Sequence, residues 1–410
     1  MDFDDTPEQA AFRQESVSWL NDNASLRSSE GAQIWRAYRP RNSEEDRDAL
    51  ELSRRWQMLK ARSGFAGIQW PVEAGGRGLA PILAAVFKQE ESRYDVPANF
   101  FQVGVDMVGP TLIEHASADM KESLLSPTRT GEHFWCQLFS EPGAGSDLAG
   151  LSTRADRDGD EYVVTGQKVW TTAAHMATHA ILLARTDWSV PKHRGISFFV
   201  LDMASPGITV RPLRQIDGAA HFSEVFLDEV RIPATNLVGA EGAGWGVALT
   251  TLNNERSAIG GGGMVQLSEL RALAETYGAF ERSEVRQRFA QLMADFEISR
   301  FIGYRVQTSL ERGDPPGAET SVFKLHISRT YERVGEFCEM VMGAAGTLAG
   351  DSAPFGGFFQ DVFLGQWAIR IGGGTDQVQR NICGERVLGL PAEPRPDKLT
   401  PFSTSGLISA

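Results

Sequence analysis

Residues 133–147 read HFWCQLFSEPGAGSD, a short apolar and aromatic run that leads into a glycine-rich loop. Further short apolar runs follow it, at residues 161–165, 179–184, 195–200, 207–210 and 223–227. Turn pairs such as Asp158-Gly159 separate these runs. Short strands with frequent turn signals are typical of a β-sandwich or barrel. Because no helix-length pattern lies between the runs, a parallel doubly wound sheet is disfavoured.

The sequence on both sides of this β module has the patterns of helices. Residues 6–9, Thr-Pro-Glu-Gln, form a capping box with proline at the first helical position. Residues 285–296 place apolar side chains at steps of 4, 3 and 4, which is one stripe of a helix. A second long helix is expected over residues 321–342, after a break at residues 313–317. We therefore predict an α+β chain with a helical domain over residues 1–132, an antiparallel β-sandwich or barrel domain over 133–240, and a helical bundle over 241–410.

Composition excludes several classes of protein. The chain has 410 residues, with 40 Lys+Arg against 53 Asp+Glu, so its formal charge is −13. This balance argues against a sequence-independent grip on nucleic acid or on an anionic membrane. No apolar run approaches the ~20 residues that span a bilayer, and the acidic first residues lack the order of a secretion signal. Three scattered cysteines favour neither a disulfide framework nor a metal site. We expect a cytoplasmic enzyme.

The glycine-rich loop at residues 140–147 is followed by other distinctive segments. Alone, a strand that leads into such a loop indicates either an anion-binding loop or a tight turn. The later segments are GQKVWTT at 166–172, GIS at 195–197, FSEVFLDEVRIP at 222–233, LNNER at 252–256, GTDQVQRN at 374–381 and ERVLGLP at 385–391. In this order and spacing they closely resemble the acyl-CoA dehydrogenase family, and the resemblance covers essentially the whole chain.

The resemblance implies a fold, a cofactor and a set of site residues. The expected fold is an N-terminal α-helical domain, a middle β domain and a C-terminal four-helix bundle, with FAD at a subunit interface of a tetramer. Residues implied to contact FAD are Phe139, Ser140, Trp170, Thr171, Thr172, Thr375 and Gln377. Residues implied to contact the acyl-CoA substrate are Ser146, Asn253, Arg256 and Gly373. An indole offers flat apolar area for a flavin ring, and a threonine hydroxyl can donate to a ring nitrogen.

The implied reaction removes an α-proton from an acyl thioester while the β-hydrogen leaves as hydride to flavin N5, which gives a trans-2-enoyl thioester. Such a proton requires a polarised carbonyl and a carboxylate base. Most of the family has a Glu two residues before the position of Thr375, where this chain has Gly373. A minority, which includes isovaleryl- and long-chain-acyl-CoA dehydrogenases, has the base in an L-x-x-E-R segment. Glu255 of Leu-Asn-Asn-Glu-Arg is therefore the predicted base.

Two FAD-contacting segments of the family differ in this chain. An Arg-x-x-Phe segment aligns with Thr276 and Ala279, and a Gln-x-x-Gly-Gly-x-Gly segment aligns with residues 340–346, MVMGAAG. The loss of an Arg from a pyrophosphate contact should weaken that contact. Two interpretations remain open. The chain forms a homotetramer that binds FAD with other residues, or it is one subunit of a mixed α2β2 assembly, as in family members that act on steroid side chains.

Substrate and acceptor are open at this stage. Glycines 260–263 follow Glu255, and they indicate either room for a bulky, branched or cyclic acyl group or close helix packing. The expected electron acceptor is an electron-transferring flavoprotein. A flavin monooxygenase on the same fold is the alternative activity, and it would not need Glu255. A nitroalkane oxidase is disfavoured because such enzymes have an Asp at the position of Gly373.

Overall fold

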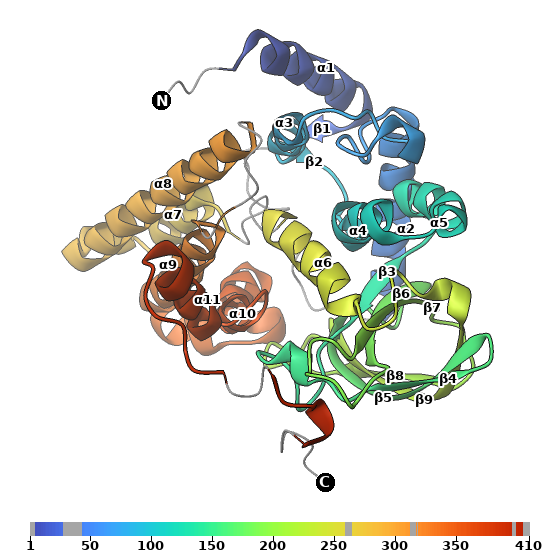
Figure 1. The fold of residues 1–410 in the computed structure, drawn as a ribbon. Helices are drawn as coiled ribbons and strands as arrows, with labels where there is room; N and C mark the ends of the chain where they lie inside the picture. The colour runs from blue at the N-terminus through green and yellow to red at the C-terminus, as the bar shows by residue number, and fades with distance from the viewer. Residues whose placement is uncertain are drawn as a thin grey trace.

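The computed structural model describes residues 5–27, 43–258, 265–311, 317, 319–395 and 399–404. Along the chain, a curled β-sheet follows a helical N-terminal region and precedes a helical C-terminal region; in Figure 1 the sheet lies below the N-terminal helices, with the C-terminal bundle to its left. This arrangement confirms the predicted α+β architecture. None of the described helices has the length and apolar composition that a membrane crossing requires.

The N-terminal region packs its helices around a small aromatic core. The helices are α1 (Pro7–Asn23), α2 (Ser43–Arg62), α3 (Pro81–Glu91), α4 (Gly109–His115) and α5 (Ala118–Thr130), with the short antiparallel strands β1 (Ser25–Leu26) and β2 (Tyr94–Asp95) and the π-helical turn η3 (Val103–Val108). The predicted capping box begins α1, because Thr6 and Gln9 exchange side-chain to backbone hydrogen bonds of 3.2 and 3.0 Å. In the aromatic core, the rings of Phe65 and Phe87 stack with their centroids 4.7 Å apart.

The middle region is a single curled sheet. Its strands are β3 (Trp135–Leu138), β4 (Arg154–Asp158), β5 (Glu161–Thr172), β6 (His179–Arg185), β7 (Ile196–Asp202), β8 (Ile208–Leu213) and β9 (Phe222–Pro233). They run in the order β3-β6-β4-β5-β9-β8, with β7 on β6. Most pairings are antiparallel, as predicted, but β3 runs parallel to β6. The chain leaves β3 through the glycine-rich loop and passes through the β4–β5 hairpin, so it re-enters β6 in the direction of β3.

Burial explains which strands the sequence could reveal. Every residue of β7 except Asp202 is buried, so this strand is a continuous apolar run, as strands covered on both faces are. The sequence pattern missed β4, because its residues, Arg-Ala-Asp-Arg-Asp, are exposed except for Ala155. Pairing with β5 holds this polar strand in the sheet.

The C-terminal region is mostly a helical bundle. Its helices are α6 (Gly244–Ala258), α7 (Leu267–Thr276), α8 (Ser283–Glu311), α9 (Glu319–Met342), α10 (Phe358–Ile371) and α11 (Asp376–Ile382). The predicted stripe on α8 is confirmed, because Val285, Phe289 and Leu292 are all buried in the bundle core. The predicted second long helix is α9. The predicted break at residues 313–317 lies, apart from Gly317, outside the described residues.

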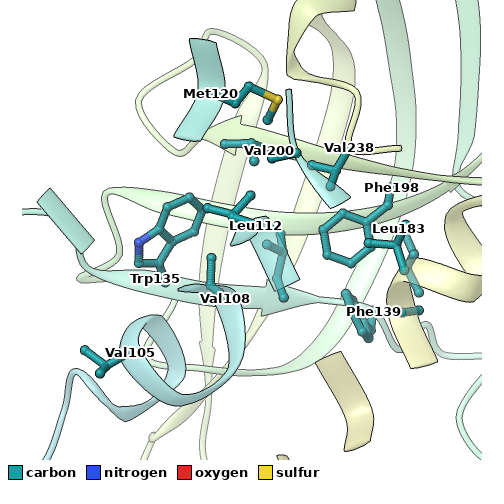
Figure 2. Packing of buried hydrophobic residues seen from close by; sticks show 14 of the residues in the cluster. Val105, Val108, Leu112, Met120, Trp135, Phe139, Leu183, Phe198, Val200 and Val238 are labelled. Carbon is teal, nitrogen blue, oxygen red and sulfur yellow. The ribbon is translucent and has the colours of Figure 1, made fainter. Parts of the chain in front are cut away.

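Helix α6 contacts the other two regions. It packs against η3, α4 and β7, and its residues Val247 and Ala248 belong to a core shared with those elements. Figure 2 shows this core, in which Leu112 lies among side chains of the sheet that include Trp135 and Phe198. The segment that contains Glu255 therefore starts from a rigid junction between the N-terminal region and the β-sheet.

Candidate active site

The glycine-rich loop at residues 140–147 is fixed from inside by Glu141. This carboxylate is buried and accepts hydrogen bonds from the backbone amides of Ser152 (2.7 Å) and Thr153 (2.8 Å). The Lys168 ammonium donates to it at 2.8 Å. Burial alone would raise the pKa of Glu141, but Lys168 and the hydrogen bonds outweigh burial and hold this pKa below its usual range. The carboxylate is therefore ionised and organises the loop.

Strand β5 brings two of the predicted flavin segments together. The Lys168 ammonium also donates to the Phe139 carbonyl at 3.0 Å, and the Val169 amide donates to the Ser140 carbonyl at 2.9 Å. The end of β3 and the Trp170 segment of β5 are therefore neighbours, as the resemblance implied. Phe139 itself is buried, with its ring edge-to-face against Phe198 at 5.8 Å.

Trp170 has an unusual backbone conformation. Its φ is +61°, and the register of β5 against β9 shifts between Lys168 and Thr171. Positive φ is costly for a bulky residue, and such strain is concentrated at functional sites. The bulge turns the indole outward, so that it is 60% exposed and touches only the Phe222 ring edge, at 5.9 Å, among the aromatic rings described. An exposed, strained indole on a rigid strand is suited to lie against a flat ligand.

Thr171 and Thr172 differ in accessibility. Thr171 is buried, and its hydroxyl has no hydrogen-bond partner among the described residues. Thr172 is exposed next to it. Ser146, the residue predicted to contact CoA, is exposed at the far end of the glycine-rich loop. Accessible hydroxyls thus border the Trp170 indole and the loop.

A second predicted group lies at the start of α11. Gly373 and Gly374 have φ of +63° and +87°, so they form a left-handed turn that favours glycine. The Gln379 amide group donates to the Gly373 carbonyl at 2.9 Å. The Gly373 N–H has no acceptor among the described residues and is therefore available to a ligand. Gly373 carries no side chain, so the base cannot come from this position.

Thr375 has a structural role besides its predicted contact with FAD. It is the N-cap of α11, and its hydroxyl accepts from the Val378 amide at 3.2 Å. Asp376 follows it, buried, and pairs with Lys324 at 3.2 Å. Burial raises the pKa of Asp376, but its hydrogen bonds and the Lys324 and Arg370 charges lower it further, so the net shift is downward. Gln377 is exposed on the first turn of α11. No hydrogen bond between described residues joins this group to the Trp170 group.

The predicted base lies on α6. Two hydroxyl contacts fix that helix against α4: Thr251 to Thr111 at 3.0 Å, and Thr250 to the His115 ring at 2.8 Å. Position 255 is one turn beyond Thr251 on the same helix. The side chains of Glu255 and Arg256 lie outside the described residues, as do glycines 260–263. Asn253 is exposed.

Arg282, which was not among the predicted site residues, lies close to both divergent segments. Thr276 ends α7, with its hydroxyl bonded to the Ala272 carbonyl, and Ala279 is buried in the bundle core. Neither presents a charge. Arg282, three residues further on, is exposed and donates to the Met340 carbonyl at 3.0 Å. An arginine is therefore held beside residues 340–346.

The described residues fit a flat cofactor with polar edges. A Cβ built on Gly143 or Gly145 would meet no atom within 4 Å, so the loop surface is open. Beside it lie the exposed indole of Trp170 and the exposed hydroxyl of Thr172. Apolar area with a few directed polar groups is the usual composition of a cofactor site. No cluster of three or more potential metal ligands occurs among the residues searched, which were those that the structure describes.

Comparison with known proteins covers all three regions. The chain matches the family models for the acyl-CoA dehydrogenase N-terminal domain (residues 21–132), middle domain (136–230) and C-terminal domain (242–388). It is 36% identical over 354 residues to acyl-CoA dehydrogenase IpdE1 of Mycobacterium tuberculosis, and this alignment covers 85% of the chain and 90% of that protein.

Two solved structures are similar in fold. The Tcur3481-Tcur3483 steroid ACAD has a TM-score of 0.80 at 28% identity, and the match covers 96% of this chain and 100% of that one. The ChsE4-ChsE5 complex from Mycobacterium tuberculosis has a TM-score of 0.76 at 27% identity, with the same coverage, 96% and 100%.

Proposed function

Because the chain belongs to the acyl-CoA dehydrogenase family, we propose that it converts an acyl-CoA thioester to the trans-2-enoyl-CoA with Glu255 as the base. The protein is a flavin-dependent oxidoreductase that acts on acyl-CoA, and FAD is its cofactor. The observation that carries the proposal is the pairing of a glycine turn at residues 372–374 with a glutamate at position 255 of α6.

The proposed base takes the α-proton. General bases contribute on the order of 10²–10⁴ to a rate when they are held near the proton. The hydroxyls of Thr250 and Thr251 anchor helix α6 to α4. Position 255 follows Thr251 by one turn, so the helix backbone that carries Glu255 is held close to this anchor. Gly373 supplies no competing carboxylate, and its N–H, which has no acceptor in the part of the chain that the structure describes, is the proposed donor to the thioester carbonyl.

The residues proposed to hold the cofactor form two groups. Phe139 and Ser140, which directly follow β3, lie beside the β5 segment that holds Trp170, Thr171 and Thr172. Thr375 and Gln377 lie at the start of α11 and are proposed to contact FAD at a subunit interface. When bound, FAD accepts the β-hydrogen of the substrate as hydride. Ser146, Asn253 and Arg256 are proposed to contact the CoA part of the substrate.

The proposed acyl group is bulky and cyclic. The support is the similarity to a structure named as a steroid ACAD.

We further propose a mixed assembly with a related subunit, since two similar structures are named as pairs of different chains. The divergent segments at Thr276 and residues 340–346 support it, because a partner would supply the missing contacts. A homogeneous homotetramer with one FAD per chain, measured by size exclusion and flavin absorbance, would contradict it. The proposed acceptor is an electron-transferring flavoprotein.

A panel of acyl-CoA esters with linear, branched and cyclic acyl groups tests the activity, with flavin bleaching as the readout. We expect Glu255→Gln to bind FAD normally and to bleach at least about 10²-fold more slowly. Glu122→Gln, at an exposed glutamate of α5, is the matched control and should retain the rate. Full turnover in Glu255→Gln would show that another group is the base.

A further inference from the structure

Residues 399–404, which we call the strap, are hydrogen-bonded to the connection between β6 and β7, although they follow the helical bundle in the sequence. Pro401 forms an antiparallel bridge with Pro191, in the connection between β6 and β7. The Phe402 amide donates to the Val190 carbonyl at 2.9 Å, and the Ser403 amide donates to the Trp188 carbonyl at 3.0 Å. In Figure 1 this is the last red segment, near the C-terminal end. The strap is thus hydrogen-bonded to the β6–β7 connection of the β domain.

Phe402 covers a buried arginine. Its ring is 1% exposed, and the Arg185 guanidinium carbon lies 3.6 Å from the ring centroid. The Trp188 ring lies at 5.6 Å on the same guanidinium. A cation held against aromatic faces away from water is a favourable contact. Arg185 has no exposed surface, so the strap takes part in keeping water from it.

Arg185 is held by carbonyl groups and not by an ion pair. Its guanidinium donates to the carbonyls of Ala149 (2.7 Å), Lys192 (3.0 Å) and Leu151 (3.1 Å). No described carboxylate forms an ion pair with it. Burial lowers the pKa of Arg185 to about 10, so the group is still charged at neutral pH. Each of its hydrogen bonds is therefore charge-assisted, and two of them hold the chain just after the glycine-rich loop.

A second connection leads from the strap to the loop. The Lys192 ammonium pairs with both oxygens of Asp147 at 2.8 and 2.9 Å, and the Lys192 carbonyl is the one that Arg185 holds. Asp147 follows Ser146, the residue proposed to contact CoA. The loop is consequently held at Asp147 from one side and at Ala149 and Leu151 from the other, and Arg185 is common to both.

We propose that the strap positions the glycine-rich loop for the CoA part of the substrate, with Phe402 acting through Arg185. This inference rests on the proposed function. Phe402 and Arg185 are positioning residues, and neither needs to touch the substrate. Loss of the ring would let water reach the guanidinium, and water would compete for the bonds to Ala149, Leu151 and Lys192. The loop would lose its fixed position, while the bundle and the strands would keep theirs.

Amide hydrogen exchange tests the mechanical link without any substrate. We expect Phe402→Ala to raise exchange at least 10-fold in peptides that cover residues 146–153, and to leave peptides of α9 unchanged. Leu399→Ala is the matched control, because this strap residue is 89% exposed. Phe402→Leu keeps an apolar cover and lacks the ring face, so it should fall between the two. Unchanged exchange in residues 146–153, or an equal rise throughout the chain, would overturn the proposal. Exchange at the wild-type level in Phe402→Leu would overturn the contribution of the ring.

Steady-state kinetics test the link to CoA. We expect Phe402→Ala to raise KM about 5–10-fold for an acyl-CoA and to leave KM unchanged for the matching acyl-pantetheine thioester. A general structural defect would affect both esters, so an equal rise, or no rise, overturns the positioning role. If the wild-type protein dehydrogenates no acyl-CoA, the proposed function fails. If the wild type is active and Phe402→Ala raises KM equally for both esters, or for neither, only the strap proposal fails.

Discussion

The Lys168 ammonium lies 2.8 Å from the Glu141 carboxylate, and the two side chains are 0% and 6% exposed. This buried pair joins β5 to the loop that follows β3. It places Phe139 and Ser140 beside the Trp170 bulge, so one ion pair holds these two segments of the proposed flavin surface together. Neither residue was among the predicted site residues. The signal in the sequence is a lysine at a position that shares the period-2 spacing of the buried Tyr162 and Val164 of β5.

Removing one member of the buried pair should be strongly destabilising. We expect Lys168→Met to lower the free energy of unfolding by about 3–5 kcal/mol, because the Glu141 charge stays buried without its partner. The double variant Glu141→Gln/Lys168→Met should lose less than the sum of the single changes. Urea unfolding measures this. Glu297→Gln is the control, since its pair with Arg300 is about half exposed, 49% and 55%, and should cost at most about 1 kcal/mol.

Backbone strain at Trp170 gives a prediction that separates stability from cofactor binding. Both Trp170→Gly and Trp170→Ala remove the indole and should lower the FAD bound per chain. Glycine adopts the φ of +61° without the steric cost that alanine has, which is about 1–2 kcal/mol. We therefore expect the flavin-free Trp170→Gly protein to unfold at the same or a higher temperature than Trp170→Ala. A lower melting temperature for the glycine variant would show that the bulge is not strained.

Two glycines should respond to alanine in opposite directions. Gly373 has a φ of +63°, so Gly373→Ala should cost about 1–2 kcal/mol. Gly303 lies within α8, where an added Cβ meets no atom within 4 Å, so Gly303→Ala should stabilise by about 0.5–1 kcal/mol. Thermal unfolding of the two variants beside the wild type checks the signs. For the same reason, a glutamate introduced at Gly373 should not replace Glu255 without a loss of stability.

Stability should fall in acid because of a stacked histidine pair. The rings of His133 and His179 are 3.8 Å apart. Burial, and to a smaller extent His133, lower the pKa of His179 to about 4, against 6.5 for the free side chain. Between these values the unfolded chain binds the proton and the folded chain does not, so the free energy of unfolding falls as pH drops from 6.5 to 4. We expect His179→Phe to flatten that fall in urea titrations at a series of pH values. An unchanged slope would contradict the assignment.

The sequence by itself determined the order of the regions and the chemistry that the chain can perform. The apolar runs of β6 and β7 were readable because almost all of their residues are buried, and the stripe on α8 was readable because its residues are buried at helical spacing. The motifs from residue 140 to residue 391 indicated the family, and the glycine at position 373 is the reason that Glu255 is the proposed base. None of these features depends on contacts between distant segments.

Only the tertiary structure decided what holds the site. The polar strand β4 forms because β5 pairs with it, and no periodic pattern marks it. The parallel pairing of β3 with β6 follows from the path of the chain between them. Arg185 is 217 residues from Phe402 in the sequence, counted from their numbers, and their contact depends on how the bundle returns the chain to the β domain. Local propensity cannot encode such contacts, because they form only when segments far apart in the chain exclude water from the same place.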